Sequence, residues 1–337
     1  MSRALRIYYN GVFGAAGGLV GWLLFGLALD ASWPWYWQML VGGALIGGAV
    51  GYLVVGWEAL LDLSVVRLFR MGTQGLLVGA AGGALGMMLG ELVNYALQDW
   101  GILPGACTGV MARGLGWLVF GLAVGLAEGW VARSWLKTSY GALGGTVGGF
   151  IGGAVFAALL GWFGREETSY VWGQAVGLVI LGACIGSLIA AVEEALKPAV
   201  LRVIRGWREG REFAILKTET TIGRDEHVDI LLLRDMKVEK YHAKVVVRDG
   251  RYFLVNTGAP PQHTLVDGQP IAQACELKEG ARIQLGEQVL VFHRRAVRQD
   301  TRAATGRAGP QAPAGQTVPE AILLPDWRRP GMRRGGA

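Results

Sequence analysis

The sequence is poor in charged residues, cysteine, histidine and proline. Only 17% of its 337 residues are charged, and it has 3 cysteines, 4 histidines and 11 prolines. The cysteines, Cys107, Cys184 and Cys275, are odd in number and far apart, which excludes a disulfide framework and a cysteine metal site. The sequence has no phosphate-binding glycine loop before a helix, no nucleophile elbow and no metal-ligand cluster. We therefore expect no enzyme activity, no metal and no cofactor.

Glycine and apolar residues are abundant instead. The chain contains 54 glycines, and 52% of its residues are hydrophobic. Six apolar stretches are long enough to cross about 30 Å of hydrocarbon as helices. No proline interrupts them, which favours unbroken helices over the broken helices of transporters. The predicted spans are residues 12–29, 37–57, 75–97, 113–131, 141–163 and 171–192.

A four-glycine pattern recurs along these stretches at offsets of 65 and 66 residues. This spacing predicts three copies of a two-helix unit, in which small residues every four positions let helix backbones approach closely. Because the first span is the counterpart of the third and the fifth, we expect it to be retained rather than cleaved as a signal peptide. The three copies are Gly14, Gly17, Gly18 and Gly21; Gly79, Gly82, Gly83 and Gly86; and Gly145, Gly148, Gly149 and Gly152.

The second helix of each unit carries a glutamate, Glu58, Glu128 or Glu193, seven residues after a glycine and nine residues before a cation. One interpretation is an acidic ring at the mouth of a pseudo-threefold bundle, because carboxylates in membranes mark ion or proton paths. The other is that the three carboxylates are hydrated at the membrane interface and pair with nearby cations. Their depth near the helix ends favours the second interpretation.

Basic residues precede the first span and follow the second, fourth and sixth, with Arg113 as the exception. This asymmetry predicts cytoplasmic termini by the positive-inside rule and explains the net charge of +6 without a nucleic-acid partner. The flanking cations are Arg3, Arg6, Arg67, Arg70, Arg133, Lys137, Lys197, Arg202 and Arg205.

The pattern changes after the sixth span. Residues 197–210 form a basic connector, for which two interpretations stay open: a short helix at the inner leaflet, or a helical stalk that continues the last span. Residues 211–298 show short alternating runs with Asp-Gly turn signals at 249–250 and 267–268, which predict a β-sandwich. Residues 299–337 are rich in Ala, Gly, Pro and Arg and are expected to be disordered.

Four strings in residues 211–298 resemble, in order and spacing, the forkhead-associated (FHA) family. The resemblance implies a sandwich of about eleven strands whose loops at one end bind phosphothreonine in a partner protein. It assigns Arg224 and Lys240 as basic residues of the phosphate site, with Thr264 in the neighbouring loop, and Gly223, His242 and Gly268 as structural residues. The strings are Thr221-Ile222-Gly223-Arg224 followed by Asp229-Ile230, Glu239-Lys240-Tyr241-His242-Ala243, Thr264-Leu265-Val266-Asp267-Gly268, and Leu277 to Gly286.

Two residues depart from the family pattern. The family's phosphate-contacting Ser is Glu239 here, and the Asn that holds the bound peptide is missing, with Gln262 as its nearest replacement. Like charges a few ångströms apart cost about 1–4 kcal/mol when partly shielded from water. Our hypothesis is that Glu239 pairs with Arg224, fills the phosphate site and leaves a domain that binds its partner without phosphorylation.

The sequence as a whole predicts an all-α six-helix transmembrane bundle followed by an all-β FHA-like sandwich. The function that it favours is a membrane-anchored adaptor or signalling protein whose cytoplasmic FHA-like domain docks a protein partner. The alternative is a transport or channel protein, in which Glu58, Glu128 and Glu193 line the path and the sandwich regulates it.

Overall fold

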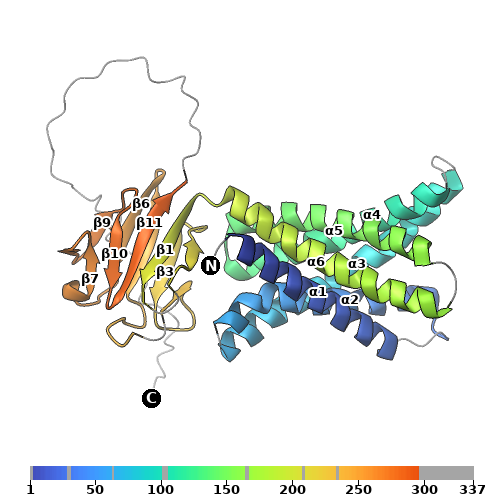
Figure 1. Ribbon diagram of the computed structural model, residues 1–337, viewed down its shortest axis with the longest axis horizontal. Coiled ribbons are helices and arrows are strands. Elements are labelled where there is room, and N and C mark those ends of the chain that lie inside the picture. Colours follow the sequence, from blue (N-terminus) through green and yellow to red (C-terminus); the bar gives the residue numbers. More distant parts are fainter. Residues whose placement is uncertain are drawn as a thin grey trace, which may run out of the picture. The chain divides into compact units, whose positions relative to one another are not determined.

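The computed structural model of the protein describes residues 3–28, 32–62, 64–100, 105–163, 167–206, 209–232 and 235–295. The chain divides into two compact units, residues 1–197 and 198–337, and each is described by itself. The first unit is helical and the second is built of strands (Figure 1). The predicted disordered tail, residues 299–337, lies outside the described residues.

Six helices are described in the first unit, and each overlaps one predicted span. All six are long and apolar enough to cross a membrane, so the protein is a multi-pass membrane protein. The helices are α1 (Arg3–Ala28), α2 (Trp35–Leu61), α3 (Val65–Trp100), α4 (Gly105–Ala132), α5 (Trp135–Phe163) and α6 (Glu167–Leu196).

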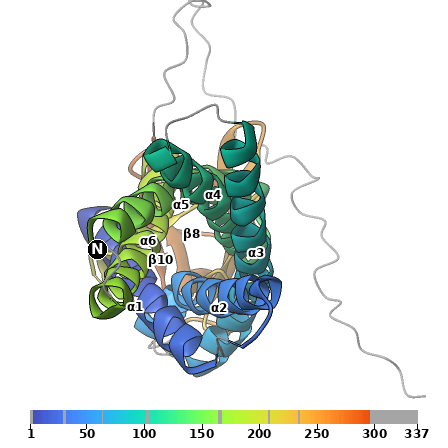
Figure 2. The same cartoon turned by 90° about the vertical axis from the view of Figure 1, so that its right-hand side faces the viewer.

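The helices form a closed ring (Figure 2). Each packs against the next along the chain, and α6 closes the ring against α1. Apolar side chains, most of them from α2, α4 and α6, fill the interior, so the unit has a packed core. The core residues are Ile46, Val50, Val54, Trp117, Phe120, Val124, Phe156, Leu160, Leu178, Leu181, Ile185 and Ile189.

The repeated glycines lie where the odd-numbered helices touch their neighbours. A Cβ added at Gly14, Gly79 or Gly145 would come within 3.0 Å of a glycine carbonyl on α6, α2 or α4 respectively. A Cβ at Gly17, Gly82 or Gly148 would clash in the same way with α2, α4 or α6. Equivalent glycines therefore face equivalent neighbours, and each odd helix touches both of its neighbours closely because both contact faces lack side chains.

The second unit is a sandwich of two sheets. One sheet has the strand order β2-β1-β11-β10-β7-β8 and the other has the order β4-β3-β5-β6-β9; all neighbours are antiparallel except β3 and β4. The strands are β1 (Ala199–Arg205), β2 (Glu212–Ala214), β3 (Glu219–Gly223), β4 (Ile230–Leu231), β5 (Ala243–Arg248), β6 (Arg251–Asn256), β7 (Thr264–Val266), β8 (Gln269–Pro270), β9 (Ala274–Glu276), β10 (Arg282–Leu285) and β11 (Gln288–Arg294).

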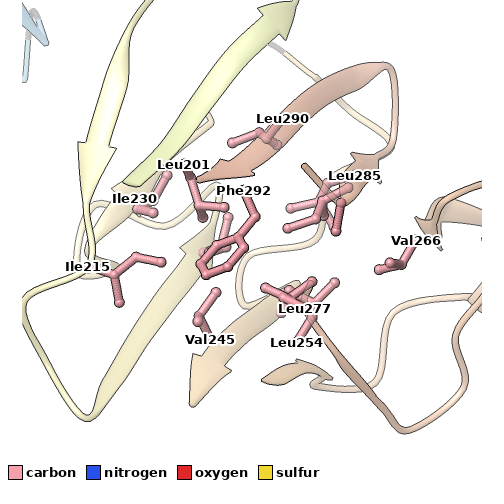
Figure 3. Close-up of a cluster of buried hydrophobic side chains, with 14 of the residues drawn as sticks. Leu201, Ile215, Ile230, Val245, Leu254, Val266, Leu277, Leu285, Leu290 and Phe292 are labelled. Carbon is pink, nitrogen blue, oxygen red and sulfur yellow. The ribbon is translucent and has the colours of Figure 1, made fainter. Parts of the chain in front are cut away.

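Side chains from both sheets meet in one apolar core between them (Figure 3). Leu201 of β1 and Phe292 of β11 are partners in the register of the first sheet, while Val245 and Leu254 come from the second sheet. All four side chains are buried. This core fixes the two sheets and thereby the loops that join them.

Both predicted Asp-Gly hairpins are confirmed. Asp249 and Gly250 have φ of 49° and 71° and join β5 to β6, and Asp267 and Gly268 have φ of 50° and 82° and join β7 to β8. Two successive residues with positive φ match the type I′ turn, whose twist fits the strands on either side. Gly268 therefore has the structural role that the family resemblance implies.

The expectation of a helical connector at 197–210 is wrong. Residues Ala199–Arg205 form β1, which lies between β2 and β11 in the first sheet. Ala199, Leu201 and Val203 are buried while Arg202 and Arg205 are exposed, which is the two-residue period of a strand. The sandwich consequently begins before residue 211, since Lys197 and Pro198 alone separate α6 from β1.

The glycine contacts predict that two single substitutions in the membrane unit change its stability by different amounts. Gly145→Ala would place a methyl group against the Gly121 carbonyl and force the α4 and α5 backbones apart, so we expect a loss of about 1–3 kcal/mol in unfolding free energy. In the control Gly161→Ala, the new methyl group meets nothing within 4 Å, and stability should not fall. Thermal unfolding of the full chain in nanodiscs measures both; equal stability of the two variants would contradict the packing account.

Candidate functional site

One end of the sandwich brings together the residues that the family resemblance selected. A Cβ at Gly223, the last residue of β3, would come within 3.0 Å of the Lys240 carbonyl, so only glycine permits this approach. The next amide, Arg224 N, donates to the carbonyls of Glu239 and Lys240 at 3.0 and 3.1 Å. Arg224, Glu239 and Lys240 therefore lie side by side because backbone hydrogen bonds connect their two segments.

His242 is the internal support of this end. Its side chain is fully buried, its Nδ1 accepts a hydrogen bond from Glu239 N at 3.0 Å, and its Nε2 lies 3.0 Å from Thr264 Oγ1 and 3.2 Å from the His263 carbonyl. Because Nδ1 is an acceptor, Nε2 carries the proton and donates. Burial lowers the pKa of His242 below its usual value, which keeps the ring neutral. His242 thus joins two binding loops and is not itself exposed to a ligand.

Two neighbouring residues differ from expectation. Thr264 was expected to contact a partner, but it is fully buried against His242, so that prediction is wrong. Gln262 is exposed in a short 3-10 helix, Pro261–His263. Asn256, which the sequence analysis missed, holds the adjoining loop: its amide group donates to the Ala259 and Ile271 carbonyls and accepts from the Gly258 and Ala259 amides.

The expected ion pair between Glu239 and Arg224 is wrong as well. Among the described residues, the Arg224 guanidinium contacts the sulfur of Met236, with Nη1 and Sδ 2.9 Å apart, and forms no ion pair with a carboxylate. Glu239 is exposed. The backbone of Glu239 contacts Arg224 N and His242 Nδ1 and its side chain is exposed, whereas the Arg224 guanidinium is directed to Met236.

Apolar groups are exposed at the same end. Met236 is 79% exposed and Tyr241 is 46% exposed, although both belong to the segment that carries Glu239 and Lys240. Exposed apolar side chains next to cations are typical of a surface that another molecule covers. The arrangement can bind an extended segment through apolar contacts and an anionic group through Arg224 or Lys240.

Comparison with known families agrees with this architecture. Residues 202–296 match a family model described as "Inner membrane component of T3SS, cytoplasmic domain", which is a domain of the FHA type. The sandwich is therefore an FHA-type domain. The match includes most of β1, in agreement with the earlier start of the sandwich. No curated protein matches the chain.

Several solved FHA domains are similar to the sandwich. The FHA domain of the CT664 protein from Chlamydia trachomatis is 24% identical, with 29% of this chain and 99% of that chain covered and a TM-score of 0.27. The N-terminal FHA domain of S. cerevisiae Rad53p, solved with a phosphothreonine peptide, is 17% identical, with 29% and 94% covered and a TM-score of 0.26. An FHA domain from Arabidopsis thaliana is 20% identical, with 35% and 92% covered and a TM-score of 0.27.

A second candidate site lies in the membrane unit, where the three predicted glutamates meet. Arg6 of α1 bridges two of them: its Nη2 lies 2.9 Å from Glu58 on α2 and 2.9 Å from Glu193 on α6. Its Nη1 lies 3.3 Å from Glu194, the residue after Glu193. Lys137 of α5 lies 3.0 Å from Glu128 on α4 and 3.9 Å from Glu193. Lys197 pairs with Glu194 at 2.6 Å. These seven residues are called the ion cluster below.

The ion cluster agrees with one part of the second interpretation, because the glutamates pair with cations, and it corrects the rest. Glu128 and Glu193 are buried, and only Glu58 is partly exposed, so the carboxylates are not hydrated interface groups. They are also not a purely acidic ring, because two cations lie between them. Of the cations that lie nine residues after a glutamate, Lys137 pairs with Glu128, whereas Arg67 binds Asp62 and Arg202 lies in β1.

The sequence contained a signal for the missed partner. Arg6 precedes Gly14 by eight residues, and Lys137 precedes Gly145 by eight residues, so both cations occupy one position of the repeated pattern. The same position before Gly79 holds Met71. Two of the three two-helix repeats thus supply a cation that pairs with the carboxylates.

The carboxylate oxygen Glu128 Oε2 is buried and accepts no hydrogen bond from the described residues.

This geometry predicts that Arg6 stabilises the ring of helices by pairing with carboxylates on α2 and α6. In Arg6→Met, Glu58, Glu193 and Glu194 would lose their shared cation while Glu193 and Glu194 stay buried, so we expect the membrane unit to lose about 3–5 kcal/mol of stability. Arg3→Met, an exposed position on the same helix, is the control and should unfold like the wild type. If both variants in nanodiscs unfolded at the wild-type temperature, Arg6 would not stabilise the ring.

Proposed function

We propose that the protein is a membrane-anchored docking protein without catalytic activity. The helical unit is the anchor, and the FHA-type domain binds a segment of a partner protein at the loop end described above. The observation that carries this proposal is the surface formed by Arg224, Met236, Lys240 and Tyr241, where cations and exposed apolar groups lie together on loops that a rigid sandwich supports. Such loops on a rigid scaffold are the usual place for binding residues.

The domain recognises its partner without requiring phosphothreonine. Glu239 replaces a hydroxyl donor with a carboxylate, and the hydrogen bond from Arg224 N to the Glu239 carbonyl keeps this residue beside the phosphate-binding position. A dianionic phosphate on Arg224 would lie near a negative charge, which costs about 1–4 kcal/mol. Arg224 itself is not neutralised by Glu239, so it remains able to bind a carboxylate or another weaker anion of the partner.

The FHA-type domain and both termini are assigned to the cytoplasm. The description of the matching family as a cytoplasmic domain supports this side, and so does the distribution of basic residues around the spans. The anchor then holds the partner at the inner face of the membrane. This arrangement suits an adaptor in signalling or assembly, because tethering raises the local concentration of whatever the domain binds.

The equivalent glycine contacts support an origin of the membrane unit in three two-helix repeats packed by a glycine zipper. A transport function has one observation in its favour, the convergence of Glu58, Glu128 and Glu193. Two observations favour an anchor: cations lie between these carboxylates, and apolar side chains fill the interior of the ring. We therefore place the function in the sandwich and give the ion cluster a stabilising role.

The test uses the full-length protein cross-linked to its neighbours in native membranes and then purified. We expect one partner to be captured equally with and without phosphatase treatment. Lys240→Glu, which reverses a charge at the loop end, should reduce its capture severalfold. The matched control is Arg251→Glu, an exposed basic residue at the opposite end of β5 and β6.

Two outcomes would contradict the proposal. One is capture that disappears after phosphatase treatment, together with micromolar binding of a phosphothreonine peptide that Arg224→Ala abolishes. The other is equal loss of capture in Lys240→Glu and Arg251→Glu, which would remove the loop end as the binding surface.

A further inference from the structure

The turn between α4 and α5 has an unusual combination of exposed side chains. Trp130 near the end of α4 is 74% exposed, and Trp135 at the start of α5 is 89% exposed. Arg133, between them, is also exposed. Both helices are long and apolar enough to span a membrane, so the turn that joins them lies where hydrocarbon gives way to lipid headgroups. Tryptophan prefers this boundary because its ring is apolar and its N–H is polar.

The turn itself has a tightly defined backbone. Arg133 N donates to the Trp130 carbonyl at 3.0 Å, and Ser134 N donates to the Gly129 carbonyl at 3.2 Å, which ends α4. Ser134 Oγ then accepts from Lys137 N at 3.2 Å and caps α5. This path gives Arg133 a φ of 51°, in the left-handed region where glycine or asparagine is preferred. The backbone alone therefore does not explain an arginine at this position.

The charge of Arg133 is not balanced within its own hairpin. Residues 129–163 contain no aspartate or glutamate, and the carboxylate that precedes them, Glu128, is buried and paired with Lys137. Arg133 forms no ion pair among the described residues. A guanidinium offers a planar set of donors that matches a phosphate group, and exposure leaves that set available.

We propose that the α4–α5 turn is a binding site for an anionic phospholipid, with Arg133 on the headgroup phosphate and Trp130 and Trp135 at the boundary of the acyl chains. The surface that continues from the turn along both helices is apolar and exposed, as Leu126 and Leu136 show, so the occupant must have an apolar part as well as an anionic one. A phospholipid has both. An anionic headgroup is favoured over a zwitterionic one because it carries no cation to oppose Arg133.

The α2–α3 turn provides an internal contrast. It is also flanked by exposed apolar residues, Val65, Val66 and Phe69, but neither α2 near its end nor α3 near its start exposes a tryptophan. Its Arg67 is turned inward to Asp62 at 3.0 Å. Arg70, further along α3, is exposed, so the feature that distinguishes the α4–α5 turn is the pair of exposed indoles beside its arginine.

The backbone of Arg133 allows a substitution that removes the side chain without strain. Arg133→Gly places glycine at a φ that glycine favours, so the variant should fold at least as well as the wild type. The full-length protein is reconstituted in nanodiscs of phosphatidylcholine alone or with phosphatidylglycerol, and bound lipid is counted by native mass spectrometry. We expect the wild type to retain phosphatidylglycerol in preference to phosphatidylcholine, and Arg133→Gly to retain it about tenfold more weakly.

The control is Arg251→Gln, which removes one exposed positive charge from the sandwich and leaves the net charge equal to that of Arg133→Gly. It should retain phosphatidylglycerol like the wild type. Equal retention by the wild type and Arg133→Gly would overturn the proposal, as would an equal reduction in both variants, because net charge would then explain the effect. A Trp135→Leu variant that also retains less lipid would support the site.

Discussion

Direct contact between helix backbones at glycine is the constraint on which the membrane unit depends. The odd-numbered helices touch both neighbours through rows of glycine, and a single added methyl group at Gly14, Gly79 or Gly145 has no space. In a bilayer no hydrophobic force drives helices together, so dispersion at short range must hold them. The close approach closes the ring between α6 and α1, and closure brings Arg6 to the glutamates of α2 and α6. The ion cluster is thus a consequence of the glycine packing, and the burial of its charges is tolerable because they are paired.

The FHA-type domain follows a different principle. Its two sheets are fixed by an apolar core, and its loop end is fixed by polar contacts to the backbone: His242 joins two loops, Asn256 holds a third, and Gly223 lets two segments touch. None of these residues needs to meet a partner. Four other residues remain at the surface of this end: Arg224, Met236, Lys240 and Tyr241. Substitutions of these four side chains could change which partner is bound without changing the loops that His242, Asn256 and Gly223 hold in place.

The sequence predicted those features that a local period encodes. Apolar length predicted six helices, glycines every four positions predicted close contacts between helix backbones, and Asp-Gly pairs predicted two hairpins. The sequence did not predict the features that depend on contacts between segments far apart in the chain. Val200, Leu201, Val203 and Ile204 fit one face of a helix as well as a strand, and the pairing of Leu201 with Phe292 of β11 makes them a strand. Glu58, Glu128 and Glu193 were found, but Arg6 was missed because its partners lie 52 to 188 residues away along the chain. Thr264 was misassigned because the motif does not indicate that its hydroxyl contacts buried His242.

If the membrane unit is a packed anchor, as we propose, the full-length protein conducts neither ions nor protons. Ion and proton flux can be measured with the protein reconstituted in sealed vesicles under a membrane potential and a pH gradient. We expect flux no greater than in protein-free vesicles. Flux above that level that Glu128→Gln abolishes, in a variant that still forms the closed bundle, would show instead that the ion cluster is part of a conduction path.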